Sequence, residues 1–288
     1  MEYLIYIATL VCIYGILGLS LNLVVGETGL LSIAQAGFYG IGAYATALLL
    51  VHTGVNFFVA MALGMVLAGV IALFIGTVLS RFSGDYYALV SLGFNVIVFS
   101  VLLNWRSLTQ GPLGIPQISQ PMIFGFSFST PILFLCLALI LLLLVYLIAS
   151  FITSSSFGRV LHAIREDEEA IAVFGYRTTY YKLAIFVISA MLAALAGALY
   201  ASYFTYIEPF SFQVVNSIFI LAVIILGGLS SHRGAVLGAL VLVIVPEALR
   251  FTGLPSDIAA QMQQVFYGLI LILLMLYRPQ GLLGKFRM

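Results

Sequence analysis

The chain has 288 residues, of which 63% are hydrophobic and 7% are charged, and its formal net charge is +1. A soluble globular domain carries about 25% charged residues, so this composition excludes a soluble protein. It predicts an all-α, polytopic integral membrane protein. The nearly balanced charge gives no indication of a nucleic-acid partner.

Nine apolar runs approach the length of about 20 residues that a membrane-spanning helix needs. They cover approximately residues 3–25, 30–52, 56–80, 85–104, 129–151, 180–203, 213–229, 234–251 and 259–277. The runs at 213–229 and 234–251 are short and are joined by a tight glycine-containing turn, so they are either two full spans or two halves of one broken element. We therefore predict a single transmembrane domain over residues 1–288 with about 8–9 helices, some of them broken at glycine.

Two segments interrupt the apolar runs with glycine and polar residues, at 27–35 and at 227–234. Paired breaks in the two halves of a transporter indicate a solute path between them. The alternative is that the small residues only allow helices to pack closely. The candidate residues of a translocation pathway are Glu27, Thr28, Ser32, Gln35, Phe38, Tyr39, Gly227 and Gly228.

The segment at 105–128 is rich in turn residues and long for a connector. Long loops are often functional, so this segment is either a plain connector or a docking surface for an external protein. We favour the docking surface.

The segment at 154–178 is the one stretch polar enough to lie in water and contact a soluble partner. Its apolar residues recur at helical spacing, and a cluster of acidic residues covers much of the remaining surface. We expect one amphipathic helix that ends at Gly175 in a left-handed cap. The alternative is an ordinary loop. The apolar positions on or near one face are Val160, Ile164, Ile171 and Phe174.

The basic residues predict the orientation in the membrane, because Lys and Arg concentrate on the cytoplasmic side. If 154–178 is cytoplasmic, nine of the eleven basic residues lie inside, and Arg106 and Arg250 lie outside. This places the loop at 105–128 outside, together with the N terminus.

Several kinds of chemistry find no support in the sequence. It contains no nucleotide-binding loop of the form G-x-x-x-x-G-K-[ST], and no nucleophile beside a base. The histidines His52, His162 and His232 lie far apart on different loops, so we predict no metal site. Asp85 and Glu247 lie near span ends, which argues against a proton-driven pump with ionisable residues deep in its spans. We therefore expect neither an enzyme nor a cofactor.

Five blocks of the sequence, in order, give it a family resemblance. They lie at 19–44, 109–116, 158–175, 226–229 and 278–284. On these blocks the chain resembles the permease subunits of branched-chain amino acid ABC importers, of the LivM type. Members of that family commonly have histidine where this chain has Gln35, so no charge-switching role is carried over to that position.

The resemblance also implies a role for the polar segment. ABC importer permeases dock on ATPase subunits through a coupling helix with a loose E-A-A-x-x-x-G pattern. Residues 169–175 fit this pattern, with Ile171 in place of the second alanine. The residues implied in coupling are Arg165, Glu166, Asp167, Glu168, Glu169, Ala170, Ile171, Phe174 and Gly175.

The resemblance implies a multi-pass protein of a bacterial or archaeal cell membrane that forms half of a translocation pathway. Its partners would be a second permease of the LivH type, two ATP-binding subunits and an external solute-binding protein, with ATP bound by the partners. The substrate would be a branched-chain amino acid. Two alternatives stay open: a permease for urea or short amides, and a gradient-driven secondary transporter.

Overall fold

The computed structural model describes residues 2–82, 84–123, 126–250, 265, 268–269 and 281–283. Apart from three residues, the predicted span at 259–277 lies outside this description. The side chains of Glu247 and Arg250 and most of the block at 278–284 lie outside it as well.

Six helices in the described ranges are long and apolar enough to cross a membrane. They are α1 (Glu2–Thr28), α2 (Gln35–Thr53), α3 (Phe57–Leu79), α4 (Asp85–Asn104), α6 (Pro131–Ser154) and α9 (Thr178–Phe204). Two further helices follow, α10 (Val214–Gly227) and α11 (His232–Arg250). Each of the eight predicted runs that fall within the described residues corresponds to one helix, which confirms the all-α polytopic class. At 1.5 Å per residue, α10 is only about 21 Å long, so the number of full spans stays a prediction.

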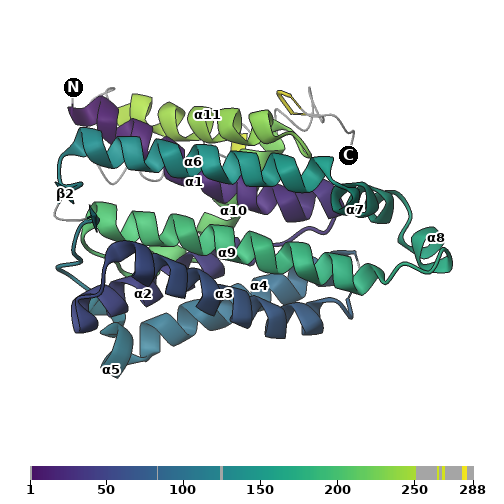
Figure 1. Ribbon diagram of the computed structural model, residues 1–288, viewed down its shortest axis with the longest axis horizontal. Helices are drawn as coiled ribbons and strands as arrows, with labels where there is room; N and C mark the ends of the chain where they lie inside the picture. Colours follow the sequence, from purple (N-terminus) through teal and green to yellow (C-terminus); the bar gives the residue numbers. More distant parts are fainter. Residues whose placement is uncertain are drawn as a thin grey trace.

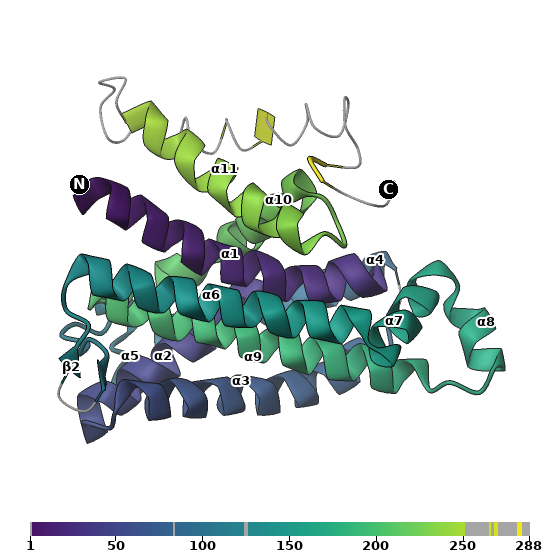
Figure 2. The ribbon, with the colours of Figure 1, turned by 45° about the horizontal axis from the view of Figure 1, so that its top comes forward.

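The bundle is built around α1 and α9. Helix α9 packs against α1, α2 and α3, and α1 also packs against α6, α10 and α11 (Figures 1 and 2). Helices α2 and α9 come especially close, because a Cβ atom at Gly42 would collide with the backbone of Ala194, and one at Gly197 with the carbonyl of Tyr39. The small residues of these helices thus serve close packing, as expected for helices in lipid.

The two long loops lie at opposite ends of the bundle, as the predicted orientation requires (Figures 1 and 2). One end carries α5 (Arg106–Thr109), η1 (Gly111–Leu113) and η2 (Pro209–Phe212), with the antiparallel pair β1 (Met122–Ile123) and β2 (Phe126–Ser127). There Ile115 forms a β-bridge with Ile207 of the α9–α10 connection. The other end carries α7 (Ser156–Glu166) and α8 (Glu168–Val173).

The first glycine break lies later in the chain than expected. Helix α1 continues through Thr28, and residues 29–34 have no regular structure. Gly29 takes a left-handed conformation with φ 72°, which glycine adopts at little cost. The Ser91 hydroxyl accepts from the amide of Ile33 at 2.9 Å. The predicted start of the second run at residue 30 is therefore wrong, since α2 begins at Gln35.

Candidate functional site

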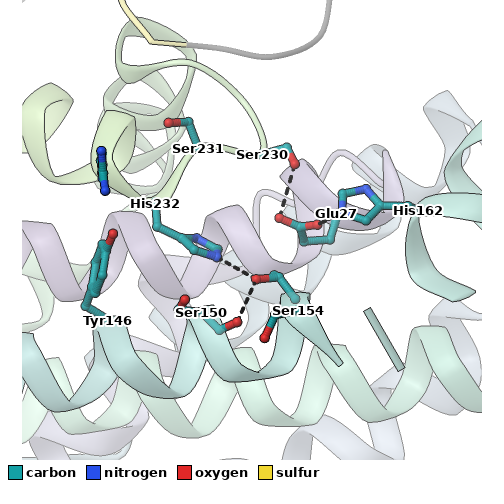
Figure 3. Close-up of a pocket in the computed structure, with 10 residues that line it drawn as sticks. Glu27, Tyr146, Ser150, Ser154, His162, Ser230, Ser231 and His232 are labelled. Carbon is teal, nitrogen blue, oxygen red and sulfur yellow. Dashed lines mark hydrogen bonds and ion pairs between the residues drawn. The ribbon is translucent and has the colours of Figure 1, made fainter. Parts of the chain in front are cut away.

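A polar cavity of about 600 Å³ lies where α1, α6 and α7 meet the turn between α10 and α11 (Figure 3). Its walls are mostly hydroxyl, imidazole and charged side chains rather than aliphatic ones. The lining residues are Glu27, Tyr146, Ser150, Thr153, Ser154, His162, Ser230, Ser231, His232 and Arg233. The cavity thus joins the end of α1, just before the first glycine break, to the second break and to the polar loop that carries α7 and α8.

Glu27, in the last turn of α1, has the most enclosed charge of the cavity, with a side chain only 1% exposed. Its Oε2 atom lies 2.8 Å from Nε2 of His162, and its Oε1 atom accepts a hydrogen bond from the Ser230 hydroxyl at 3.2 Å (Figure 3). A buried carboxylate is tolerated only when it is paired and hydrogen-bonded. The Ser230 hydroxyl supplies a hydrogen bond to Oε1, and the His162 ring lies at ion-pair distance from Oε2.

Arg165, one turn of α7 beyond His162, supports the same end of α1. Its guanidinium donates to the carbonyl of Gly26. Burial lowers the pKa of Arg165, and the carboxylates of Glu27 and Glu166 oppose that shift. The guanidinium nevertheless stays charged, because an arginine side chain is not deprotonated in proteins.

The second break packs directly on the end of α1, just before the first break. The amide of Ser230 donates to Oδ1 of Asn22 at 3.0 Å, and a Cβ atom at Gly26 would lie 2.7 Å from that amide nitrogen. Gly228 has φ 109° and Ser230 has φ 59°, so the turn depends on left-handed conformations. The two glycine-rich segments that the sequence singles out are therefore neighbours in space.

Residues from the far end of the chain close the second break. The amides of Leu282 and Leu283 donate to the carbonyls of Leu226 and Gly227, each at 2.9 Å. Those carbonyls belong to the last turn of α10, where a helix leaves its acceptors unsatisfied.

Two of the three histidines line this one cavity, although they are distant in sequence. His162 contacts Glu27, and Nε2 of His232 lies 3.0 Å from the Thr153 hydroxyl. Their separation along the chain does not reveal this proximity, which arises because α7 and the start of α11 lie at the same end of the bundle. The signal that points to them is their position, His162 on α7 and His232 at the start of α11, directly after the glycine-rich turn. His52 lies in the last turn of α2, where its ring bonds to the carbonyl of Leu48.

Of the predicted pathway residues, Glu27 lines the cavity and the others lie deeper or beside it. Gln35 donates to the Ser20 hydroxyl, deep in the bundle. The ring of Phe38 packs at a tilt against that of Phe94, with the ring centroids 4.9 Å apart. The remaining predicted residues are buried as well: Thr28, Ser32, Tyr39, Gly227 and Gly228. A role for these residues in a pathway stays a prediction.

The predicted single helix in the polar loop is two helices. Asp167 is extended, with φ −156° and ψ 99°, and its carboxylate accepts from the amide of Ala170 at 3.0 Å. Asp167 therefore ends α7 and caps the start of α8. As a result Ile164 is 4% exposed whereas Phe174 is 79% exposed, so the two do not share a face.

Helix α8 projects from the bundle and buries none of its residues (Figures 1 and 2). Val173 and Phe174 form its exposed apolar tip, and Glu166, Asp167 and Glu169 are exposed around it. Oε1 of Glu168 lies 2.6 Å from Nζ of Lys182 on α9. Ala170 and Ile171 are partly exposed. Gly175 has φ 89°, which confirms the predicted left-handed cap.

Comparisons with known proteins place these features in a family context. A family model described as the permease component of the branched-chain amino acid transport system matches residues 3–275. The high-affinity branched-chain amino acid transport system permease protein LivM of Escherichia coli is 37% identical, over 98% of this chain and 70% of its own length. The LivM protein of Salmonella typhimurium matches equally well, and the E. coli LivH permease is 29% identical over 96% of this chain and 93% of its own length. No solved structure shows a significant match.

Proposed function

Since the chain belongs to the family of branched-chain amino acid transport permeases, we propose that it forms half of the translocation pathway of an ATP-driven importer for branched-chain amino acids. The chain is a multi-pass membrane protein. Its proposed partners are a second permease of the LivH type, two ATP-binding subunits and an external solute-binding protein. In this proposal ATP is bound and hydrolysed by the partners and not by this chain.

The observation that carries the proposal is the shape of helix α8. An apolar tip of Val173 and Phe174, 87% and 79% exposed, stands at the end of a polar loop and outside the bundle. An amphipathic helix of this kind docks by placing its apolar residues in a groove of a partner. We assign this tip to the ATP-binding subunit, with the exposed carboxylates of Glu166, Asp167 and Glu169 at its rim.

The names of the relatives favour a branched-chain amino acid over urea or a short amide, because the LivM and LivH proteins are permeases for branched-chain amino acids. A self-powered secondary transporter is the competing mechanism. We propose the ATP-driven mechanism because the chain combines membership of this family with an exposed helix suited to a soluble partner.

Reconstitution tests the proposal. The chain is inserted into liposomes alone, or with the second permease, the two ATP-binding subunits, the binding protein and ATP, and uptake of labelled leucine is measured. We expect uptake only with the complete set. Uptake by this chain alone under a proton or sodium gradient would establish the secondary transporter, and uptake of labelled urea in place of leucine would change the substrate.

Impermeant thiol labelling tests the orientation. Glu169→Cys in the polar loop and Leu113→Cys in the loop at 105–128 both place a thiol at an exposed position. The background lacks Cys12 and Cys136. We expect the first thiol to react only from the cytoplasmic side and the second only from outside. Labelling of both from one side would contradict the orientation.

A further inference from the structure

Three separate parts of the chain meet at the carboxylate of Glu27. Its two oxygens contact His162 of α7, at 2.8 Å, and Ser230 of the turn between α10 and α11, at 3.2 Å. All three side chains point into the same cavity (Figure 3). The carboxylate is 1% exposed, whereas His162 is 35% exposed. Glu27 therefore has contacts on the loop side and on the bundle side at once.

Backbone contacts reinforce both sides of this junction. On the loop side, Arg165 donates to the carbonyl of Gly26. On the bundle side, the amide of Ser230 donates to Asn22, one turn earlier in α1. Helix α7 and the second break are thus each held to the end of α1 by one side-chain and one backbone contact.

The ion pair of α8 does not involve Glu27. Glu168 pairs with Lys182 at 2.6 Å, which ties α8 to the first turn of α9. The polar loop therefore reaches the two glycine breaks through α7. Along the chain, a force applied at the exposed tip of α8 passes Asp167, where the loop bends, and then α7 before it reaches Glu27. A second route leads through Lys182 into α9, which packs against α1.

The charge of the Glu27 carboxylate opposes any movement that separates α1 from α7 or from the turn between α10 and α11. Hydrogen bonds to an ionised acceptor are shorter and stronger than those between neutral groups. Separating a buried carboxylate from one of its donors leaves a charge that is poorly solvated. Movement of α7 without α1, or of the turn without α1, is therefore unfavourable.

We infer that Glu27 is the positioning residue that makes α7 and the two glycine breaks move as one unit. Displacement of the polar loop then changes both breaks together. The inference rests on the proposed function and extends it by naming the side chain through which movement of the loop reaches the pathway.

The experiment uses the complete importer in liposomes and measures leucine transported per ATP hydrolysed. Glu27→Gln removes the charge, and His162→Leu removes the donor. We expect both variants to keep ATP hydrolysis and to lose about tenfold in transport per ATP, since one hydrogen bond to a charged group contributes roughly that factor or more.

Two variants serve as matched controls. His162→Gln retains an N–H donor near the position of Nε2 and is expected to keep most of the wild-type ratio. Thr77→Ala removes a hydroxyl of α3 that does not line the cavity and that donates to the carbonyl of Phe74 at 2.7 Å, and it is expected to leave the ratio unchanged.

A variant with a smaller change keeps the test informative if the first two variants misfold. Ser230→Ala removes one donor from Glu27 and is expected to lower the ratio several-fold. Combined with Glu27→Gln it should add little, because contacting residues are not independent. Wild-type ratios in Glu27→Gln and His162→Leu, or additive losses in the double variant, would overturn the inference while leaving the proposed function intact. A wild-type complex that fails to import leucine would overturn both.

Discussion

The polar loop contributes two helices of opposite character. Helix α7 buries Gly158, Leu161 and Ile164 and contacts the end of α1 through His162, whereas α8 buries none of its residues. Asp167 separates them by ending one helix and capping the next. The difference shows that one amphipathic sequence can supply both an inner helix that belongs to the bundle and an outer helix left for a partner.

The largest expected effect is on the free energy of unfolding, which we expect to depend more on α7 than on α8. Leu161 is fully buried in α7, so Leu161→Ala should lower the free energy of unfolding by about 2–5 kcal/mol. Val173→Ala on α8 should change it by less than about 0.5 kcal/mol, as for other exposed positions. Thermal unfolding of the detergent-solubilised protein measures both. Equal destabilisation by the two changes would show that α8 is packed against the bundle.

The next largest effect is on binding of the ATP-binding subunit, which distinguishes α8 from α7. Phe174→Ala should weaken binding of the ATP-binding subunit about tenfold or more, since a few apolar anchors dominate such interfaces, and should leave the unfolding temperature unchanged. Leu113→Ala is the matched control, because Leu113 is equally exposed, at 79%, in the loop at the other end. Quantitative co-purification is the measurement. Unchanged binding by Phe174→Ala would exclude α8 as the docking helix.

A smaller effect concerns the end of α8. Gly175 has φ 89°, and a Cβ atom there would meet no other atom within 4 Å. Gly175→Val should therefore cost about 1 kcal/mol through backbone strain alone, and transport should fall while membrane insertion is retained. Gly175→Asn should be milder, because asparagine tolerates the left-handed region. Transport by the assembled complex distinguishes the variants, and equal losses would point to steric exclusion of the partner instead.

The smallest effect concerns the ion pair of α8. Lys182 is 7% exposed and Glu168 is 38% exposed, so water screens the pair from one side. Glu168→Gln should destabilise α8 by about 1 kcal/mol or less, and Glu169→Gln, at an exposed neighbour, by still less. Hydrogen exchange of the α8 amides measures the change. A loss that extends into α7 would show that the two helices unfold together.

The sequence was sufficient for the parts of the fold that depend on local pattern. Apolar runs predicted eight helices within the described residues, and the glycine cap at residue 175 followed from conformational preference alone. The division of the polar loop was missed because Asp167 was counted as part of an acidic surface, although aspartate is also a favoured N-cap. The first break was expected from residue 27, whereas Glu27 and Thr28 still belong to α1 and the irregular structure begins at Gly29.

The candidate site was harder to predict because it depends on contacts between distant segments. Glu27 was identified beside a glycine break, but its partners His162 and Ser230 lie more than a hundred residues away in the chain. Nothing in local sequence pairs a histidine of one loop with a glutamate of another. Only the return of α7 and the α10–α11 turn to the same end of the bundle brings them together.

The hydrogen bonds from Leu282 and Leu283 to the end of α10 also set an order of events during synthesis. The acceptors on Leu226 and Gly227 emerge well before the donors that satisfy them. An unpaired carbonyl is costly in hydrocarbon, so a newly inserted α10 has to keep this end near water until the later segment arrives. Formation of these two hydrogen bonds is therefore a late step of folding, because contacts between residues so far apart in the chain form slowly.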